Sequence, residues 1–109
     1  MTIEDKSVID FIGTDKESGL VGLLISDHLE WSNDKRSLLK DKVSAYLDFI
    51  ESGELEENYP DVKGRGVYIE LVHHYEPNDD GMQLLTKIKD ISAQCGVRFT
   101  WSQWIKELH

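Results

Sequence analysis

The sequence contains few of the residues that mark secreted or membrane-spanning proteins. Its 109 residues include a single cysteine, Cys95, which cannot form an internal disulfide. The N-terminus has no basic and apolar leader, and the longest apolar run, Leu23-Leu24-Ile25, is far shorter than the roughly 18 residues that a membrane span requires. These absences lead us to expect a cytoplasmic protein.

Basic residues are also scarce. Twelve lysines and arginines stand against 21 aspartates and glutamates, which gives a formal net charge of -9 at pH 7. Because an acidic surface repels phosphate groups, we expect no binding to nucleic acid or to anionic membranes. The hydrophobic fraction of 39% is sufficient for a globular core, and the length allows one domain, residues 1–109.

Common catalytic and metal-binding motifs are missing as well. There is no Gly-x-Ser-x-Gly elbow, no phosphate-binding glycine loop and no dinucleotide fingerprint. His73 and His74 are neighbours on a predicted strand, so their side chains point to opposite faces and do not share a metal ion easily. Cys95 lies on the apolar stripe of a predicted helix, which indicates a buried thiol. We therefore predict no enzymatic activity, no cofactor and no metal ligands.

The hydrophobic pattern of the first half predicts a hairpin followed by a helix. Ser7 to Gly13 and Leu20 to Asp27 are apolar segments joined by a short polar loop, as in two antiparallel strands. A helix is predicted from about Asp34 to Glu51, because apolar residues recur there at intervals of three and four. These apolar residues are Leu38, Leu39, Val43, Tyr46, Leu47 and Ile50.

The second half predicts a strand, a helix and a final strand. The strands are expected over Val67 to Tyr75 and Val97 to Ile105, and the helix begins near Pro77 and ends at Gly96. The order is β-β-α-β-α-β, and each helix makes a right-handed crossover between parallel strands. The predicted fold class is α+β, a mixed α/β domain with a four-stranded mixed sheet and two helices on one face.

The other face of this sheet is predicted to be open and partly apolar. Alternation along the strands places Tyr68, Val72 and Trp104 on it. Such a patch is typical of self-association, and the chain could form a homodimer through it. The alternative is that a terminal segment folds over the patch.

Charge is distributed unevenly along the chain. Residues 1–62 contain 15 acidic and six basic side chains, a net charge of -9, whereas residues 63–109 contain six of each. A run without any base begins where the first helix ends, and carboxylates there oppose the helix macrodipole, each by about 0.3–1 kcal/mol. The run consists of Asp48, Glu51, Glu54, Glu56, Glu57 and Asp61.

This run has a functional interpretation and a structural one. In the functional interpretation, the run forms a docking surface for a basic protein, and the apolar residues among the carboxylates contact that protein. In the structural interpretation, the run is a solvated loop that keeps the protein soluble, and Tyr59 packs back onto the domain. The predicted partner-binding residues are Glu51, Glu54, Leu55, Glu56, Glu57, Tyr59 and Asp61.

A second candidate site lies where the second strand leads into the first helix. Crevices form at the carboxyl edge of sheets with parallel crossovers, so the side chains of this turn could bind a small ligand or a metal ion. The alternative is a structural turn, in which Asp27 or His28 bonds loop amides and Trp31 packs against the start of the helix. The candidate ligand-binding residues are Asp27, His28, Glu30 and Trp31.

Several stretches resemble a family of small single-domain bacterial proteins of unknown function. They are Lys6 to Gly13, Ile25 to Trp31, Tyr46 to Gly53 and Tyr59-Pro60-Asp61, and the string Ser-Asp-His-Leu-Glu-Trp is the most specific part. This resemblance implies no activity and transfers no catalytic residue. In size and charge the chain also resembles immunity proteins of bacterial toxin systems, which cover a basic toxin with carboxylates. That likeness implies a non-catalytic, inhibitor-like binding protein.

Overall fold

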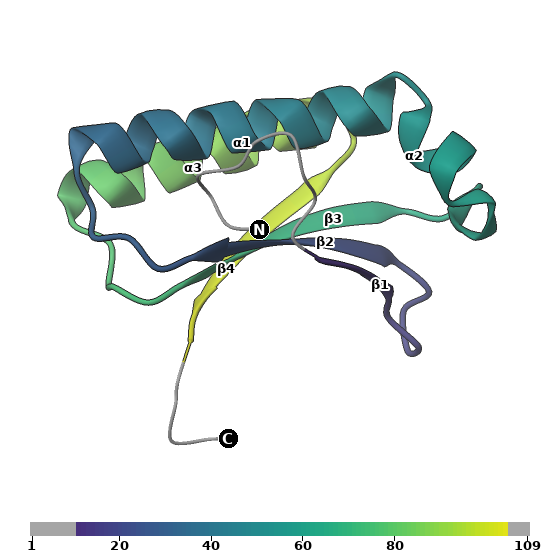
Figure 1. Cartoon of the computed structure of the whole chain (residues 1–109), viewed down its shortest axis with the longest axis horizontal. Coiled ribbons are helices and arrows are strands. Elements are labelled where there is room, and N and C mark those ends of the chain that lie inside the picture. The colour runs from purple at the N-terminus through teal and green to yellow at the C-terminus, as the bar shows by residue number, and fades with distance from the viewer. Residues whose placement is uncertain (1–10, 105–109) are drawn as a thin grey trace.

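The predicted strands form one four-stranded sheet in the order β1-β2-β3-β4 (Figure 1). The computed structural model describes residues 11–104, so residues 7–10 and 105 of the predicted strands lie outside the described part. The strands are β1 (Phe11–Thr14), β2 (Val21–Asp27), β3 (Val67–His73) and β4 (Arg98–Gln103). β1 is antiparallel to β2, and the β2–β3 and β3–β4 pairs are parallel.

Two long helices cover one face of the sheet, as predicted (Figure 1). They are α1 (Asn33–Glu51) and α3 (Asp79–Gln94). The connection between α1 and β3, which the sequence analysis treated as loop, also contains the short helix α2 (Glu54–Asn58) and the 3₁₀ turn η1 (Pro60–Val62). The α+β class and the order of the main elements are thus confirmed, and α2 and η1 were missed.

Side-chain caps and one glycine define the ends of α1. The hydroxyl of Ser32 accepts a hydrogen bond from the backbone N–H of Lys35 at 3.1 Å, which satisfies a free donor of the first turn. Gly53 follows the helix with φ of 86°, a left-handed conformation that glycine adopts without steric cost. The chain therefore turns sharply here, and α2 starts at the next residue.

The core lies between the helices and the inward face of the sheet. Alternate residues of the strands point toward the helices, and the helices contribute the apolar side of each amphipathic surface. The hydroxyl of Tyr46 donates to the backbone carbonyl of Leu24 at 2.9 Å, so α1 is also bonded to β2. Central members of the core are Leu23, Ile25, Leu39, Ile69, Leu71, Leu85 and Phe99.

The prediction of a buried Cys95 is wrong. α3 ends at Gln94, so Cys95 is the C-cap, where the chain leaves the helical period, and its side chain is exposed. Val97 takes the next buried position instead. A hydrogen bond with the Glu51 carboxylate, together with partial desolvation and the negative charge of Glu51, raises the pKa of the Cys95 thiol.

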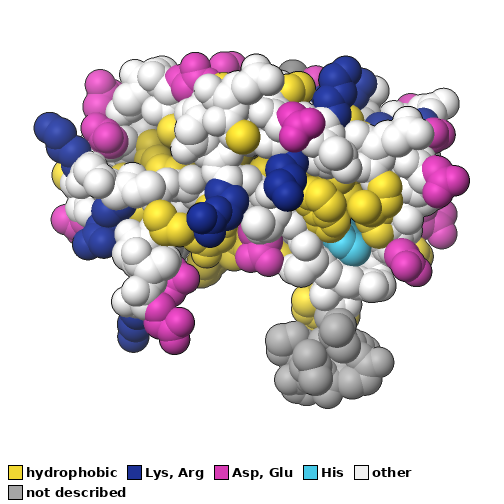
Figure 2. Space-filling view, turned by 180° about the vertical axis from the view of Figure 1, so that it is seen from behind, with side chains coloured by type: hydrophobic (Ala, Val, Ile, Leu, Met, Phe, Trp, Pro, Cys, Tyr) yellow, Lys and Arg dark blue, Asp and Glu magenta, His cyan; other side chains and the backbone are white. Residues whose placement is uncertain are grey.

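β4 forms one edge of the sheet, and the face of the molecule seen in Figure 2 shows hydrophobic side chains between the helix layer and the sheet. Lysine and arginine side chains lie across this hydrophobic band, whereas most acidic side chains lie around the outline. Lys89 and Arg98 border a shallow hollow with Phe99 and Trp101. Basic groups thus gather locally on a protein whose net charge is -9.

Within residues 11–104, no helix combines the length and the apolar character needed to cross a bilayer.

Leu55 offers a test of whether α2 is anchored to the core. Its side chain is 2% exposed, so Leu55→Ala should leave a cavity and lower the free energy of unfolding by about 2–4 kcal/mol. Glu56→Ala, at the exposed neighbouring position, should change it by less than about 0.5 kcal/mol. Urea unfolding measures both, and equal effects of the two substitutions would contradict the anchored arrangement.

Candidate functional site

The acidic run forms a continuous exposed segment at the C-terminal end of α1 (Figure 1). Its members lie on the last turns of α1, on α2 and on η1. Tyr59, between α2 and η1, is 41% exposed and lies within this acidic segment. We name this set the acidic surface: Asp48, Glu51, Glu54, Glu56, Glu57, Tyr59 and Asp61.

Leu55 does not belong to the acidic surface. The sequence analysis expected it to contact a partner, but its side chain is buried in the core and points away from solvent. Val62, at the end of η1, is 7% exposed and forms a second anchor. The apolar residues of this segment therefore fix it to the domain, and Tyr59 remains as its exposed aromatic side chain.

The carboxylates of the acidic surface are not neutralised by neighbours. Among the residues described, none of them has a cationic group within 4.0 Å, and the last turn of α1 contains no basic residue. Asp48 and Glu51 oppose the negative end of α1, as predicted. However, Glu54, Glu56 and Glu57 lie in the first turn of α2, where carboxylates are favourable, so only part of the run opposes a helix dipole.

The Asp27–Trp31 turn has a different character, because its key side chains point inward. Asp27 ends β2 on the same face as Ile25, and it is fully buried. One carboxylate oxygen accepts the backbone N–H of Leu29 at 3.1 Å, which closes the turn. The other lies 2.5 Å from the ammonium of Lys35, in the first turn of α1, whose side chain is 1% exposed.

Three further contacts complete what we name the edge network: Asp27, Trp31, Lys35, His73 and Tyr75. The Lys35 ammonium lies 3.6 Å from the centre of the Trp31 ring, a close cation–π contact. The Trp31 indole N–H donates to the backbone carbonyl of Tyr75 at 2.9 Å. His73, paired with Asp27 in the β2–β3 register, donates through Nδ1 to the same carbonyl at 3.0 Å.

Trp31 also reaches α3. A Cβ atom at Gly81 would lie 2.7 Å from the Trp31 ring, closer than side-chain atoms approach in proteins. Gly81 is buried in the first turn of α3, and its backbone N–H is held by the Asn78 side chain at 2.7 Å. The edge network therefore joins the ends of β2 and β3 to the starts of both long helices.

Burial controls the protonation of the two basic groups in the edge network. Desolvation lowers the pKa of Lys35, and the hydrogen bond and charge of Asp27 partly offset it. Desolvation also lowers the pKa of His73, and the charge of Lys35 acts in the same direction. The bond to Tyr75 and the charges of Asp27 and Glu76 oppose these effects on His73.

The small-ligand interpretation of this turn therefore keeps only two of the four side chains that the sequence suggested. Asp27 and Trp31 are engaged inside the edge network, as the structural-turn alternative described. His28 and Glu30 are exposed at the surface of the turn. Within residues 11–104, no three His, Cys, Asp or Glu side chains are grouped so that they could hold a metal ion.

The open face of the sheet does not bring together all three residues predicted for it. Tyr68 pairs with Arg98 at the start of the β3–β4 ladder, whereas Trp104 follows the last pair, His73 with Gln103. Tyr68 and Trp104 are thus about 20 Å apart along the strands, near opposite ends of the sheet. Trp104 stacks on His74, with ring centres 5.0 Å apart.

The sequence analysis missed Lys35 as the partner of Asp27, yet the sequence held a signal for this pair. Lys35 is four residues before Leu39 and so lies on the apolar side of α1. Asp27 lies two residues after Ile25 and so continues the inward side of β2. Opposite charges at two inward positions indicate a buried ion pair, whereas the sequence analysis followed only the apolar members of each pattern.

Comparison with protein families gives one match. A model of a family of unknown function (DUF6572) matches residues 1–105, nearly the whole chain. Comparisons with curated proteins and with solved structures give no match.

The first prediction from this geometry concerns the buried ion pair. Asp27→Leu leaves the Lys35 ammonium buried without its counter-ion and should lower the free energy of unfolding by about 3–5 kcal/mol. The double variant Asp27→Leu/Lys35→Met removes both charges and should recover most of that loss. Urea unfolding of the two variants measures the difference, and a double variant as unstable as Asp27→Leu would contradict the pairing.

The second prediction concerns how the free energy of unfolding depends on pH. Burial holds the pKa of His73 below its ordinary value near 6.5, so the unfolded chain binds the proton more tightly than the folded protein. The stability contributed by neutral His73 is therefore present above pH 6.5 and is lost as the pH falls toward the folded pKa.

Unfolding in urea at about pH 7.5 and about pH 5.5 tests this effect. His73→Gln should lose less stability between the two pH values than the unsubstituted protein, because the titrating group is gone. His74→Gln keeps His73 and should retain the full loss. If His73→Gln and the unsubstituted protein lose the same amount, His73 does not titrate as described.

Proposed function

The chain belongs to this family of unknown function, and we propose that it is a non-catalytic protein-binding domain that docks a basic protein through the acidic surface. The observation that carries the proposal is a cluster of six exposed carboxylates on an anchored segment around exposed Tyr59, with no neutralising cation among residues 11–104. The inhibitor-like or immunity-like role expected from size and charge is the concrete form of this proposal.

The electrostatics favour such a partner. The whole net charge of -9 comes from residues 1–62, and the acidic surface lies in the longest stretch of that region without a base, residues 43–62. Surface charge of one sign steers an oppositely charged protein during encounter and raises the association rate. Screening by salt should weaken this attraction, because the carboxylates are exposed.

The anchoring of the segment also favours binding. Leu55 and Val62 fix α2 and η1 to the core, and Asn58 donates from its side chain to the Glu54 carbonyl at 2.9 Å. A segment that is already ordered loses less conformational entropy on binding than a flexible loop. Tyr59 is an aromatic residue of the type that contributes most of the energy at protein interfaces.

The proposed lack of catalysis rests on how the fold uses its titratable groups. Within residues 11–104, the fold buries Asp27, Lys35 and His73 together, and it buries Lys42 elsewhere on α1, with its ammonium 5.5 Å from the centre of the Tyr46 ring. Asp27, Lys35 and His73 are each bonded to another group of the protein, and their main effect is to join β2, β3 and α1. The carboxylates of the acidic surface are exposed instead, and among them Glu51 accepts a hydrogen bond from the Cys95 thiol.

A charge-reversal experiment tests the proposal. In the variant Glu54→Lys/Glu56→Lys/Glu57→Lys, the charge at each of the three positions changes from -1 to +1, so the net charge changes from -9 to -3. A matched control, Glu17→Lys/Asp41→Lys/Asp90→Lys, makes the same change at exposed positions outside the acidic surface. Circular dichroism and urea unfolding establish that both variants fold.

Each immobilised protein is then exposed to a lysate of its source organism and washed at low and high salt. We expect one basic protein to bind the unsubstituted chain and the matched control, and to be released by high salt. The triple variant at α2 should bind it at least about tenfold more weakly. Retention of that protein by the α2 variant, or its equal loss from the matched control, would overturn the assignment of the acidic surface.

A further inference from the structure

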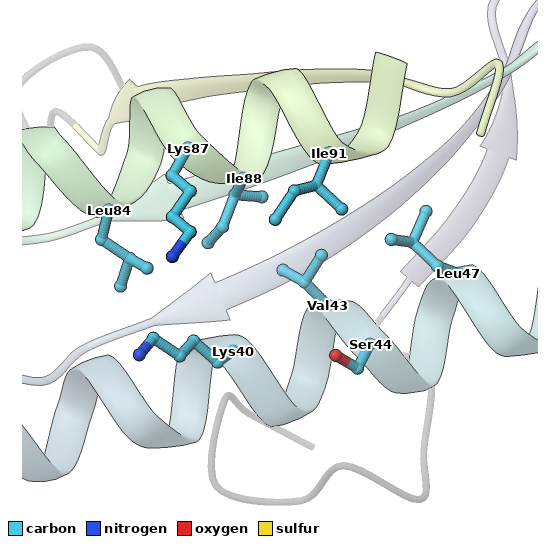
Figure 3. A pocket seen from close by; sticks show the side chains of 8 residues that line it. All are labelled: Lys40, Val43, Ser44, Leu47, Leu84, Lys87, Ile88 and Ile91. Carbon is cyan, nitrogen blue, oxygen red and sulfur yellow. The ribbon is translucent and has the colours of Figure 1, made fainter. Parts of the chain in front are cut away.

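A groove lies between α1 and α3, and the residues that line it belong neither to the acidic surface nor to the edge network. It encloses a volume of about 230 Å³, and its side chains come from facing positions of the two helices (Figure 3). Its apolar floor is made by Val43 and Leu47 of α1 and by Leu84, Ile88 and Ile91 of α3. We name this the helix groove.

Two lysines stand at one end of the helix groove. The side chains of Lys40 and Lys87 come from opposite helices and reach toward the same space, beside Leu84 (Figure 3). Both lysines are exposed, and neither has a carboxylate within 4.0 Å in the part of the chain that the structure describes. Two like charges therefore face each other across an apolar floor.

Positive charge continues beyond this end of the groove. A second, more open hollow shares Lys40, Leu84 and Lys87 with the groove and is also lined by Arg36. Asp80, the acidic residue lining this hollow, lies 3.9 Å from Arg36. An incoming anion would thus meet two uncompensated ammonium groups and a guanidinium, on a protein that is otherwise strongly acidic.

The opposite end of the groove is apolar and partly open. Ile91 is 44% exposed, an unusual position for a large aliphatic side chain on the same helix side as buried Ile88. Lys40 and Leu47 are seven residues apart on α1, so the floor is about 10 Å long from the charged end to the apolar end. An extended alkyl chain advances about 1.3 Å along its axis for each carbon–carbon bond of about 1.5 Å, so a chain of about eight carbons spans about 9 Å and fits this length.

We propose that the helix groove binds a single-chain amphiphile with an anionic head, of the class of medium-chain fatty carboxylates. The carboxylate lies between Lys40 and Lys87, where it relieves their mutual repulsion, and the alkyl chain covers Ile88 and Ile91. The charged end, the apolar floor and the length of the groove each match one part of such a molecule. This inference does not depend on the proposed function of the acidic surface.

The ligand series that tests the proposal varies one property at a time. Hexanoate, octanoate and decanoate are titrated into the full chain, and amide chemical shifts in ¹⁵N-labelled protein locate the site. The amide shifts should change mainly at residues 40–47 and 84–91. The dissociation constant of octanoate should be millimolar or lower. Affinity should rise about fourfold for each added methylene up to about eight carbons and then level off, because the floor ends near Leu47.

The head group is tested with octanol and octyltrimethylammonium, which keep the chain and change the charge. Octanol should bind more weakly than octanoate, and the cation more weakly still. Equal binding of the cation would overturn the proposal, since the groove would then be only an apolar patch. An acidic apolar peptide that shifts the same amides, while octanoate has no effect, would overturn it in favour of a protein ligand.

Variants on the two helices provide the matched comparison. Lys40→Gln and Lys87→Gln should each weaken octanoate binding about three- to tenfold, as expected for loss of an ionic hydrogen bond. Lys89→Gln, an exposed position of α3 that does not line the groove, should leave the affinity unchanged. Ser44→Phe, which fills the groove from an exposed position, should abolish binding. If a folded Ser44→Phe protein binds octanoate normally, the ligand lies elsewhere.

Discussion

The ion pair between Asp27 and Lys35 is the interaction on which the arrangement of this domain depends. Both side chains are buried, and a buried charge is tolerated only when a partner and further hydrogen bonds satisfy it. Lys35 meets this demand with the Asp27 carboxylate, the Leu29 carbonyl at 2.9 Å and the Trp31 ring. These contacts require the end of β2 and the start of α1 to adopt one relative position. The ion pair thus fixes where α1 begins on the sheet, and the apolar core between the helices and the sheet makes the packing.

The periodic parts of the fold could be predicted from the sequence, because each obeys one repeating rule. The apolar residues from Leu38 to Ile50 recur every three or four positions and indicated α1, and the order of elements followed from the short connections. The errors occur where a pattern ends. Cys95 fits the apolar stripe of α3 by spacing, but the helix stops one residue before it. The sequence analysis expected Leu55 to face solvent. A single apolar residue among glutamates shows no periodicity, so the sequence did not reveal that its side chain points inward.

The candidate sites divide in the same way. The acidic surface is contiguous in sequence, so its residues could be predicted directly, apart from buried Leu55. The edge network and the helix groove join residues far apart in the chain, such as Lys40 and Lys87, which only the packing of α1 against α3 brings together. As a result α1 carries different chemistry along its length: the ammonium group of Lys40, which has no carboxylate within 4.0 Å among the described residues, in its first half, and carboxylates at its end. A helix with this polarity can present two surfaces of opposite charge to two different classes of molecule.

The parallel strands have a consequence for how the domain folds. Only β1 and β2 can pair through a short hairpin, whereas the β2–β3 and β3–β4 ladders must wait for long crossover segments to close. The hydrogen bond from Trp31 to the Tyr75 carbonyl joins residues 44 positions apart. Closing such a loop lowers the entropy of the chain before the native contacts between its ends have formed. Folding is therefore slower than in helical bundles of similar size. The Trp31 indole forms this hydrogen bond only when these distant segments meet, so its fluorescence is a natural reporter of this long-range step in assembly.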